Sequence, residues 1–149
     1  MYEIPKIEVP VEILLMNAES IEGNLFVTED LLSAGGNPLL EELLNDSPEM
    51  FFPFVSRAGA YRLINKNHIV QIKCEQDDAE VKTQTPLPPR NLVIHFTNDR
   101  TVFGVVYPTL AEETRASDII NQDEQFLVLY QNGQKLIINR HHVIYANAN

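Results

Sequence analysis

The sequence predicts a mostly β protein with short α-helical inserts, in which one small unit occurs twice in tandem. Three observations lead to this fold class. Short apolar segments alternate with turn residues, glycines recur inside those segments, and blocks of the first half align without gaps with blocks of the second half. Internal repetition of this kind is typical of chains in which one folding unit has been copied.

Two blocks carry the internal repeat. Residues 11–27 align with residues 92–108, and residues 51–72 align with residues 125–146. The residues that recur in register are Asn17 with Asn98, Gly23 with Gly104, Phe52 with Phe126, Gly59 with Gly133, Asn65 with Asn139, and His68 with His142. Shared hairpin chemistry could make two short segments look alike, but two colinear blocks indicate a duplication.

The first block predicts a β-hairpin in each copy. Asn17-Ala18 and Asn98-Asp99 supply the turns, because Asn and Asp tolerate the left-handed backbone that tight hairpins require. Gly23 and Gly104 lie inside the second strand of their hairpins, where a glycine usually marks a bulge or the sharp bend of a small barrel.

A helical insert follows the second strand of each copy. Asn37-Pro38 predicts the start of the first insert, since proline is favoured at the first helical position. Residues 109–112 have the form of a capping box and predict a second helix that runs to about residue 120. A second hairpin comes next, and Asn132-Gly133 is a strong signal for its turn. A short break then precedes a final strand.

The repeat sets the expected domain organisation. Residues 1–74 form the first repeat and residues 91–149 form the second. Residues 75–90 are acidic and then proline-rich, with no apolar period, which is typical of a linker.

Composition narrows the classes of function. The chain has 44% apolar residues and a net charge of −10. An acidic chain without a basic face disfavours nucleic acid as a partner. No apolar run reaches the ~18–20 residues of a membrane span, and the first residues lack the pattern of a secretory signal. Cys74 is the only cysteine, so no internal disulfide can form, and we expect a cytoplasmic protein.

Five short strands, arranged as two hairpins and a last strand after a tight turn, resemble the small barrels of SH3-like and Sm-like proteins. Residues 63–72 and 137–146 are similar to the second Sm signature, in which a short turn joins strands four and five. The chain also resembles an uncharacterised bacterial domain family, through Leu44-Asn45, then Phe51/Phe52, then Asn65-Lys66-Asn67-His68. The resemblance implies two tandem small barrels and no established activity.

The chain departs from Sm-like RNA binders at the positions that hold RNA. A helical insert replaces the loop before strand three, and neither Asn65-Lys66-Asn67 nor Asn139-Arg140-His141 contains the arginine-glycine pair of those proteins. The resemblance therefore extends to the fold and not to the RNA site.

The candidate interaction residues lie in the two equivalent turns before the last strands. They are Asn65, Lys66, His68, Asn139, Arg140 and His142. The recurring histidines favour a structural role in fixing these turns, with partner contact as the alternative. We expect no catalytic residue, no metal site and no cofactor, because no Cys/His spacing resembles a zinc site and no nucleophile lies beside a base in the sequence.

The sequence favours a non-enzymatic module for protein interaction or assembly, with a protein partner or self-association through strand edges. Two other functions remain open. One is an RNA-binding Sm-like protein that uses Lys66 and Arg140, and the other is a ligand binder or small enzyme with a site between the repeats.

Overall fold

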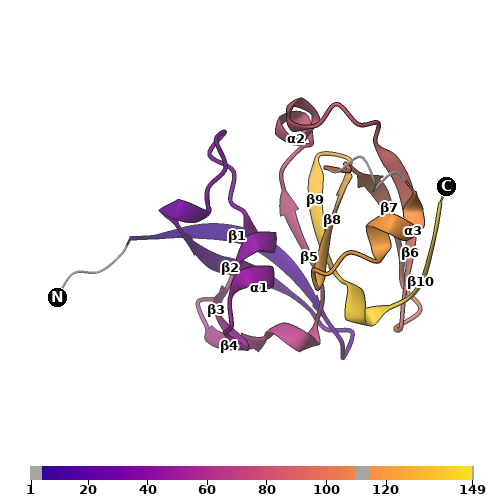
Figure 1. Cartoon of the computed structure of the whole chain (residues 1–149). Coiled ribbons are helices and arrows are strands. Elements are labelled where there is room, and N and C mark those ends of the chain that lie inside the picture. The colour runs from indigo at the N-terminus through magenta and orange to yellow at the C-terminus, as the bar shows by residue number, and fades with distance from the viewer. Residues whose placement is uncertain (1–4, 110–114, 149) are drawn as a thin grey trace.

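The computed structural model describes residues 5–109 and 115–148. Within these residues, ten strands form one antiparallel sheet, accompanied by three short α-helices and three 3-10 turns (Figure 1). The prediction of a mostly β protein with short helical inserts is therefore confirmed.

The strands fall into two consecutive sets of five. The first set is β1 (Lys6–Leu15), β2 (Ser20–Thr28), β3 (Phe51–Ser56), β4 (Tyr61–Asn65) and β5 (Ile69–Glu75). The second set is β6 (Arg90–Phe96), β7 (Thr101–Val106), β8 (Phe126–Gln131), β9 (Gln134–Asn139) and β10 (Val143–Ala148). The α-helices are α1 (Leu40–Asp46), α2 (Ala79–Gln84) and α3 (Ala116–Ile120), and the 3-10 turns are η1 (Glu29–Leu31), η2 (Lys66–His68) and η3 (Arg140–His142).

Strand order in the sheet is β10-β6-β7-β8-β9-β5-β1-β2-β3-β4. In each set the fifth strand pairs with the first, and both pairings contain a register irregularity, one beside Val70 and one at Ile144. The two sets are not separate sheets, because β5 of the first set pairs antiparallel with β9 of the second. This leaves β4 and β10 as the two edges of the described sheet.

The first hairpin turns are the same in both sets. Ala18 and Asp99 have φ angles of 69° and 66°, the left-handed conformation that the turn requires. The preceding asparagine side chain stabilises each turn: Asn17 Oδ1 accepts a hydrogen bond from Glu19 N, and Asn98 Oδ1 accepts one from Arg100 N. The two hairpins thus use one local solution at matching positions.

The two glycines inside the second strands also lie in matching places. A Cβ atom on Gly23 would collide with the carbonyl oxygen of Val55, and one on Gly104 would lie 3.0 Å from the carbonyl oxygen of Tyr130. Each glycine therefore allows the third strand of its set to cross the second at close range.

The second hairpins match only after a correction of one residue. The ungapped alignment places Phe52 opposite Phe126, but Phe51 pairs with Asn65 in the first set and Phe126 pairs with Asn139 in the second. Phe51, and not Phe52, is therefore the structural counterpart of Phe126. The offset arises because residues 56–60 form a turn closed from Ser56 N to Ala60 O, whereas Asn132-Gly133 makes a two-residue turn.

The helical inserts begin later than the sequence predicts. Helix α1 starts at Leu40, three residues after Asn37, and no side chain caps it. Helix α3 starts at Ala116, where the Asp118 carboxylate accepts hydrogen bonds from the backbone N–H and the side chain of Arg115. Most of the capping box predicted at residues 109–112 lies outside the described residues. The segment between the sets, predicted as a linker, contains α2, whose Glu80 accepts hydrogen bonds from Ser33 and Asn37.

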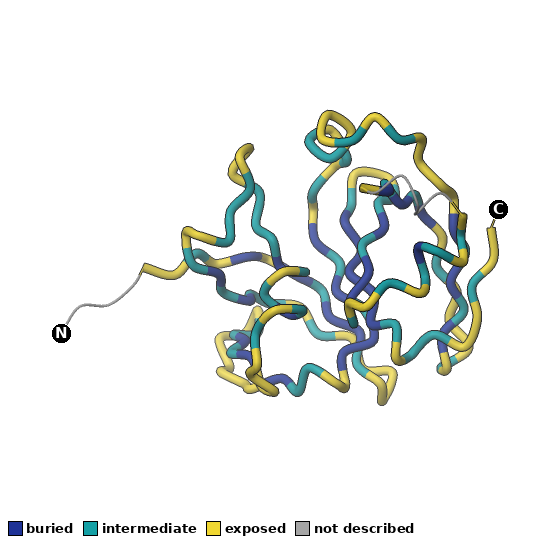
Figure 2. Tube along the Cα trace, viewed as in Figure 1, coloured by how far each residue is buried: buried dark blue, intermediate teal, exposed yellow. Residues whose placement is uncertain are grey.

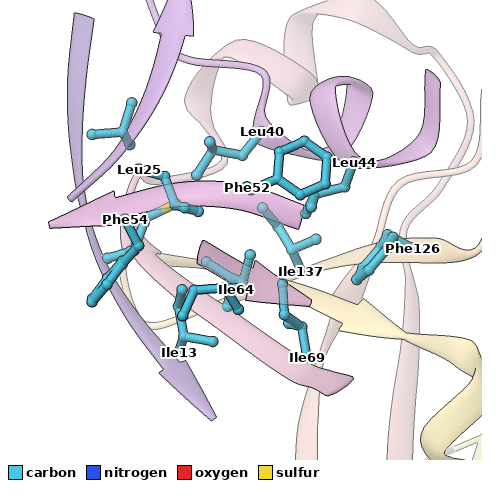
Figure 3. Packing of buried hydrophobic residues seen from close by; sticks show 14 of the residues in the cluster. Ile13, Leu25, Leu40, Leu44, Phe52, Phe54, Ile64, Ile69, Phe126 and Ile137 are labelled. Carbon is cyan, nitrogen blue, oxygen red and sulfur yellow. The ribbon is translucent and has the colours of Figure 1, made fainter. Parts of the chain in front are cut away.

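The buried residues form two clusters, and both cross the boundary between the sets. Figure 2 shows the buried segments along the chain. The first cluster is built on β1–β5 and α1 but includes Phe126 and Ile137 (Figure 3). The second is built on β6–β10 and α3 but includes Leu14 and Val70. Each half therefore completes its core with residues of the other.

Candidate interaction site

The six candidate interaction residues lie in and immediately before the equivalent turns η2 and η3. Asn65 and Asn139 precede the turns, and their side-chain oxygens accept hydrogen bonds from Asn67 N at 2.9 Å and His141 N at 3.0 Å. Both asparagines thus fix the turn that redirects the chain into the last strand. This is a structural role that the two repeats share.

Lys66 and Arg140 bind carbonyl groups at the C-terminal ends of the helical inserts. Lys66 Nζ donates to the carbonyl oxygens of Leu44 at 3.3 Å and Ser47 at 3.2 Å. Arg140 donates from Nη1 to Ile120 O at 2.8 Å and from Nε to the carbonyl oxygen of Glu124. A cation at a helix C-terminus satisfies carbonyls that lack partners within the helix. Each cation therefore ties its insert to the turn.

The two histidines hold the turns through the backbone, and within the described part of the chain His142 also bonds through its ring. The carbonyl oxygens of His68 and His142 accept hydrogen bonds from Met16 N and Thr97 N, both at 2.9 Å. The His142 ring donates from Nε2 to the Asn67 carbonyl oxygen at 2.8 Å, across the boundary between the repeats. His141 and His142 both belong to η3, so they lie in the turn and not on the last strand.

The pairing of β5 with β9, together with the side-chain contacts across it, is called the junction below. Asn139 is fully buried there and donates from Nδ2 to the Ile69 carbonyl oxygen at 2.8 Å. Asn45 of α1 bonds the backbone of Phe126 twice: its Oδ1 accepts from Phe126 N at 2.8 Å, and its Nδ2 donates to Phe126 O at 3.2 Å. Helix α1 is thereby fixed to β8 of the other repeat.

A charged pair adds to the junction. Lys135 on β9 is 1% exposed, and its Nζ lies 2.6 Å from Glu41 Oε1 on α1. A hollow of about 320 Å³ lies beside this pair. It is lined mainly by polar residues, among them Asn45 of the first repeat, Glu80 of the segment between the repeats and Tyr130 of the second repeat. Neither His68 nor His142 lines it, so the hollow does not bring a histidine together with the carboxylates.

The thiol of Cys74 is buried close to this pair. Burial raises its pKa to about 11; Lys135 lowers it and Glu41 raises it by smaller amounts. A thiol that keeps its proton at neutral pH is a poor nucleophile. Among the described residues, no group of three or more histidine, cysteine, aspartate or glutamate side chains is placed to hold a metal ion, and none of the described helices is long and apolar enough to cross a membrane.

The positions that the junction buries are exposed at the two edges of the sheet. Phe126, Lys135 and Ile137 are at most 1% exposed, whereas their counterparts Phe51, Tyr61 and Leu63, on β3 and β4, are 48%, 65% and 57% exposed. On the other side of the junction Val70 is 1% exposed, and its counterpart Ile144 on β10 is 59% exposed. Both edges therefore present large apolar side chains to solvent.

Sequence reasoning missed the residues that contribute most to the junction, namely Asn45, Phe126, Lys135, Ile137 and Val70. The repeat alignment already contained a signal for four of them, because Phe126, Lys135, Ile137 and Val70 fall in its second block. The alignment does not show which strand neighbours which, and so it could not separate a buried copy of a position from an exposed one.

Comparison with protein-family models, with curated proteins and with solved structures finds no match to this chain.

Proposed function

We propose that the protein is a non-enzymatic interaction or assembly module made of two Sm-like or SH3-like small barrels that act through the edges of their shared sheet. The observation that carries the proposal is the contrast between the junction and the edges. Strand pairing at the junction buries one set of apolar positions. The same positions lie exposed beside β4 and β10, whose outer sides have no neighbouring strand among the described residues. An uncovered apolar edge readily accepts another strand.

The chemistry of the turns agrees with an assembly role. Lys66 and Arg140, the cations that an RNA-binding alternative would use, are engaged with helix carbonyls. With a net charge of −10, the chain offers a phosphate backbone little attraction at long range. A catalytic alternative would need a reactive group in the hollow at the junction. Lys135 there is bonded to Glu41, and the nearby Cys74 thiol is protonated.

The proposal is tested by blocking both edges and comparing the proteins captured with each form of the chain. Leu63→Pro and Ala146→Pro together remove one backbone donor from each edge strand, and a strand lacking that donor cannot form a full ladder. Partners captured by the native chain should be lost with the double variant. Capture that is indifferent to both substitutions would contradict the proposal. Far-UV circular dichroism confirms beforehand that the variant is folded.

A matched control keeps the edges intact and alters another exposed aromatic residue. Phe103 on β7 is 56% exposed and lies in the interior of the sheet, away from both edges. Phe103→Glu should leave capture unchanged. Added short single-stranded RNA at low salt should bind neither form, whereas binding that vanishes with Lys66→Ala and Arg140→Ala would favour the RNA-binding alternative.

A further inference from the structure

We propose that the partner of the open edges is a second copy of this chain, and that copies assemble head to tail through pairing of β10 in one copy with β4 in the next. This inference rests on the proposed function and specifies its partner. The junction supplies the template, because β5 and β9 are the counterparts of β10 and β4 in the internal repeat. The chain thus carries one complete interface and the two halves of another.

The register of the proposed pairing follows from the junction. Within the chain Gln71 pairs with Ile138, Ile72 with Ile137, and Lys73 with Leu136. Transferring each residue to its counterpart in the other repeat gives the intermolecular pairs, which are Tyr145 with Ile64, Ala146 with Leu63, Asn147 with Arg62, and Ala148 with Tyr61. Both strands are long enough for this ladder, since β4 covers Tyr61–Asn65 and β10 covers Val143–Ala148.

Backbone N–H and C=O groups on β4 and β10 point outward, as hydrogen bonding between β10 of one copy and β4 of the next requires. Lys66 N donates to Met50 O and Ser56 N to Ala60 O, which identifies the hydrogen-bonded pairs between β3 and β4. Residues opposite each other alternate along an antiparallel pair, so Tyr61 and Leu63 direct their N–H and C=O groups away from β3 and toward the open edge. On β5, the bond from Gln76 N to Gly133 O sets the same alternation, so Ile72 directs its backbone N–H and C=O groups toward β9. Its counterpart Ala146 should direct the same groups toward the open edge of β10.

The apolar side chains also complement each other. At the junction Phe126 and Ile137 complete the core of the first repeat, while Val70 enters the core of the second. In the proposed interface, the exposed Phe51 and Leu63 of one copy would take the places of Phe126 and Ile137 against the second repeat of its neighbour. Ile144 of that neighbour would take the place of Val70.

Two asparagines are placed to repeat the polar contacts of the junction. Asn65 is the counterpart of Asn139, and no acceptor for its side-chain nitrogen is seen among the described residues, whereas Asn139 bonds Ile69 O. In the assembly Asn65 would bond Val143 O of the neighbour. Asn121 corresponds to Asn45 and would bond the backbone of Phe51. The Lys135–Glu41 pair has no equivalent, because Tyr61 occupies the matching position on β4.

The direction of assembly is fixed by the difference between the two edges. A contact between β10 and β4 is heterologous, so each added copy again presents one free β10 and one free β4. Such contacts continue until the assembly closes into a ring or extends as a filament. Pairing of β4 with β4, or of β10 with β10, would instead stop at a dimer.

The test uses the purified full-length chain and two variants that each block one edge, measured by light scattering coupled to size exclusion. The native chain should have a mass several times that of one copy. Leu63→Pro alone and Ala146→Pro alone should each be monomers, and an equimolar mixture of the two should form a one-to-one dimer through the remaining β10 and β4. A single variant that dimerises on its own would overturn the head-to-tail arrangement.

A second set of variants guards against local unfolding caused by proline. Leu63→Glu should also yield monomers, and Ala146→Lys in the partner should restore association with it, because the two side chains lie opposite each other in the proposed register. Phe103→Glu is the matched control and should assemble like the native chain. Failure of Leu63→Glu to change the mass would overturn the proposed interface.

Disulfide formation checks the register itself. In a Cys74→Ala background, a chain with Arg62→Cys mixed with a chain with Asn147→Cys should cross-link under mild oxidation. The pair Leu63→Cys with Asn147→Cys is shifted by one residue and should cross-link at least tenfold more slowly. Equal rates would contradict the register.

The outcomes separate this inference from the proposed function. A native chain that is monomeric at all concentrations, but that captures other proteins only when its edges are intact, overturns self-assembly and leaves the interaction module standing. A monomeric chain whose captured proteins are indifferent to the edge variants overturns both.

Discussion

At the scale of single residues, Gly23 and Gly104 have the clearest structural role, which is to allow two strands to cross at close range. Each lies where the third strand of its repeat crosses the second, and a Cβ atom at either position would meet backbone atoms of the crossing strand. Backbone atoms cannot move aside as the end of a flexible side chain can. An added methyl group would therefore displace the two strands from each other and lower the free energy of unfolding.

The two glycines differ in how little space they have. Gly23→Ala would press against Val55 O and against Ser56 Cα at 2.8 Å, whereas Gly104→Ala would meet its nearest atoms at 3.0 Å. We expect Gly23→Ala to lower the free energy of unfolding by about 3 kcal/mol or more, and Gly104→Ala by about 1–2 kcal/mol. Urea unfolding followed by circular dichroism measures both values, and a larger loss for Gly104→Ala would contradict this account.

Because of Cys74, the free energy of unfolding should decrease as the pH rises through the alkaline range. Burial raises the pKa of its thiol from 9.0 to about 11 in the folded chain, so the unfolded chain releases this proton first as the pH rises. Below pH 9.0 both states keep the proton and the thiol contributes nothing to the pH dependence. Stability is then lost progressively up to about pH 11, by at most roughly 2–3 kcal/mol.

Cys74→Val isolates this contribution. Valine is apolar and close in size, so it keeps the packing and removes the titrating group. The difference in free energy of unfolding between the variant and the native chain should be constant below about pH 9 and should shift in favour of the variant above it. Chemical denaturation at a series of pH values measures it, and parallel curves throughout would show that the thiol does not titrate as described.

At the scale of elements, each helical insert is tied to its own repeat and one is also tied to the other repeat. Lys66 and Arg140 bind the carbonyl ends of α1 and α3, so the inserts and the turns η2 and η3 form one unit in each repeat. Asn45 extends the first unit across the junction by bonding both backbone groups of Phe126.

Asn45→Ala should therefore destabilise the chain more than the equivalent change in α3. It leaves the Phe126 N–H group without a partner in a partly buried place, which costs about 1–3 kcal/mol. Asn121→Ala removes only an exposed bond to Ser117 O within its own turn, and it should change the stability of the monomer by less than about 0.5 kcal/mol. Thermal unfolding of both variants in the Leu63→Pro background, where no assembly is expected, makes the comparison. Equal losses would argue against a special role for Asn45.

At the scale of the whole molecule, the two repeats are joined as firmly as the parts of one domain. Their sheet is continuous and their buried clusters exchange side chains. Among the described residues, no strand covers the outer sides of β4 and β10, and exposed apolar residues lie beside them. Proteins that avoid association usually protect their edges with charge or proline. An interface of this kind buries apolar surface, and its strength should rise when charge repulsion between copies is screened.

Salt tests that expectation directly. Each copy carries a net charge of −10, so copies repel one another at low ionic strength. Raising the salt concentration from about 0.05 M to about 0.5 M shortens the screening length several-fold, and the dissociation constant for self-association should fall as salt rises. Light scattering over a dilution series at both salt concentrations measures it. A dissociation constant that rises with salt would show that ion pairs, and not apolar strand pairing, hold the copies together.

The sequence by itself determined the turns and the strand glycines of each repeat, but not where the helical inserts begin. Turn residues such as Asn17 and Asn98, the glycines within strands, and the asparagines before η2 and η3 act on backbone a few residues away, so their effect can be read from the residues alone. The alignment error of one residue between Phe52 and Phe126 has a local cause as well, since it comes from a longer turn that changes the register of the strand beside it.

Only the tertiary structure decided which copy of a position is buried. Leu63 and Ile137 are equivalent and equally apolar in sequence, yet one is exposed and the other lies in a core. The difference arises because a neighbouring strand covers β9 and none covers β4 among the described residues. Strand neighbours far apart in sequence are chosen by the free energy of the complete packing, which no short pattern encodes. The sequence thus determines which residues a strand contains, but only the fold determines whether that strand lies at an edge of the sheet.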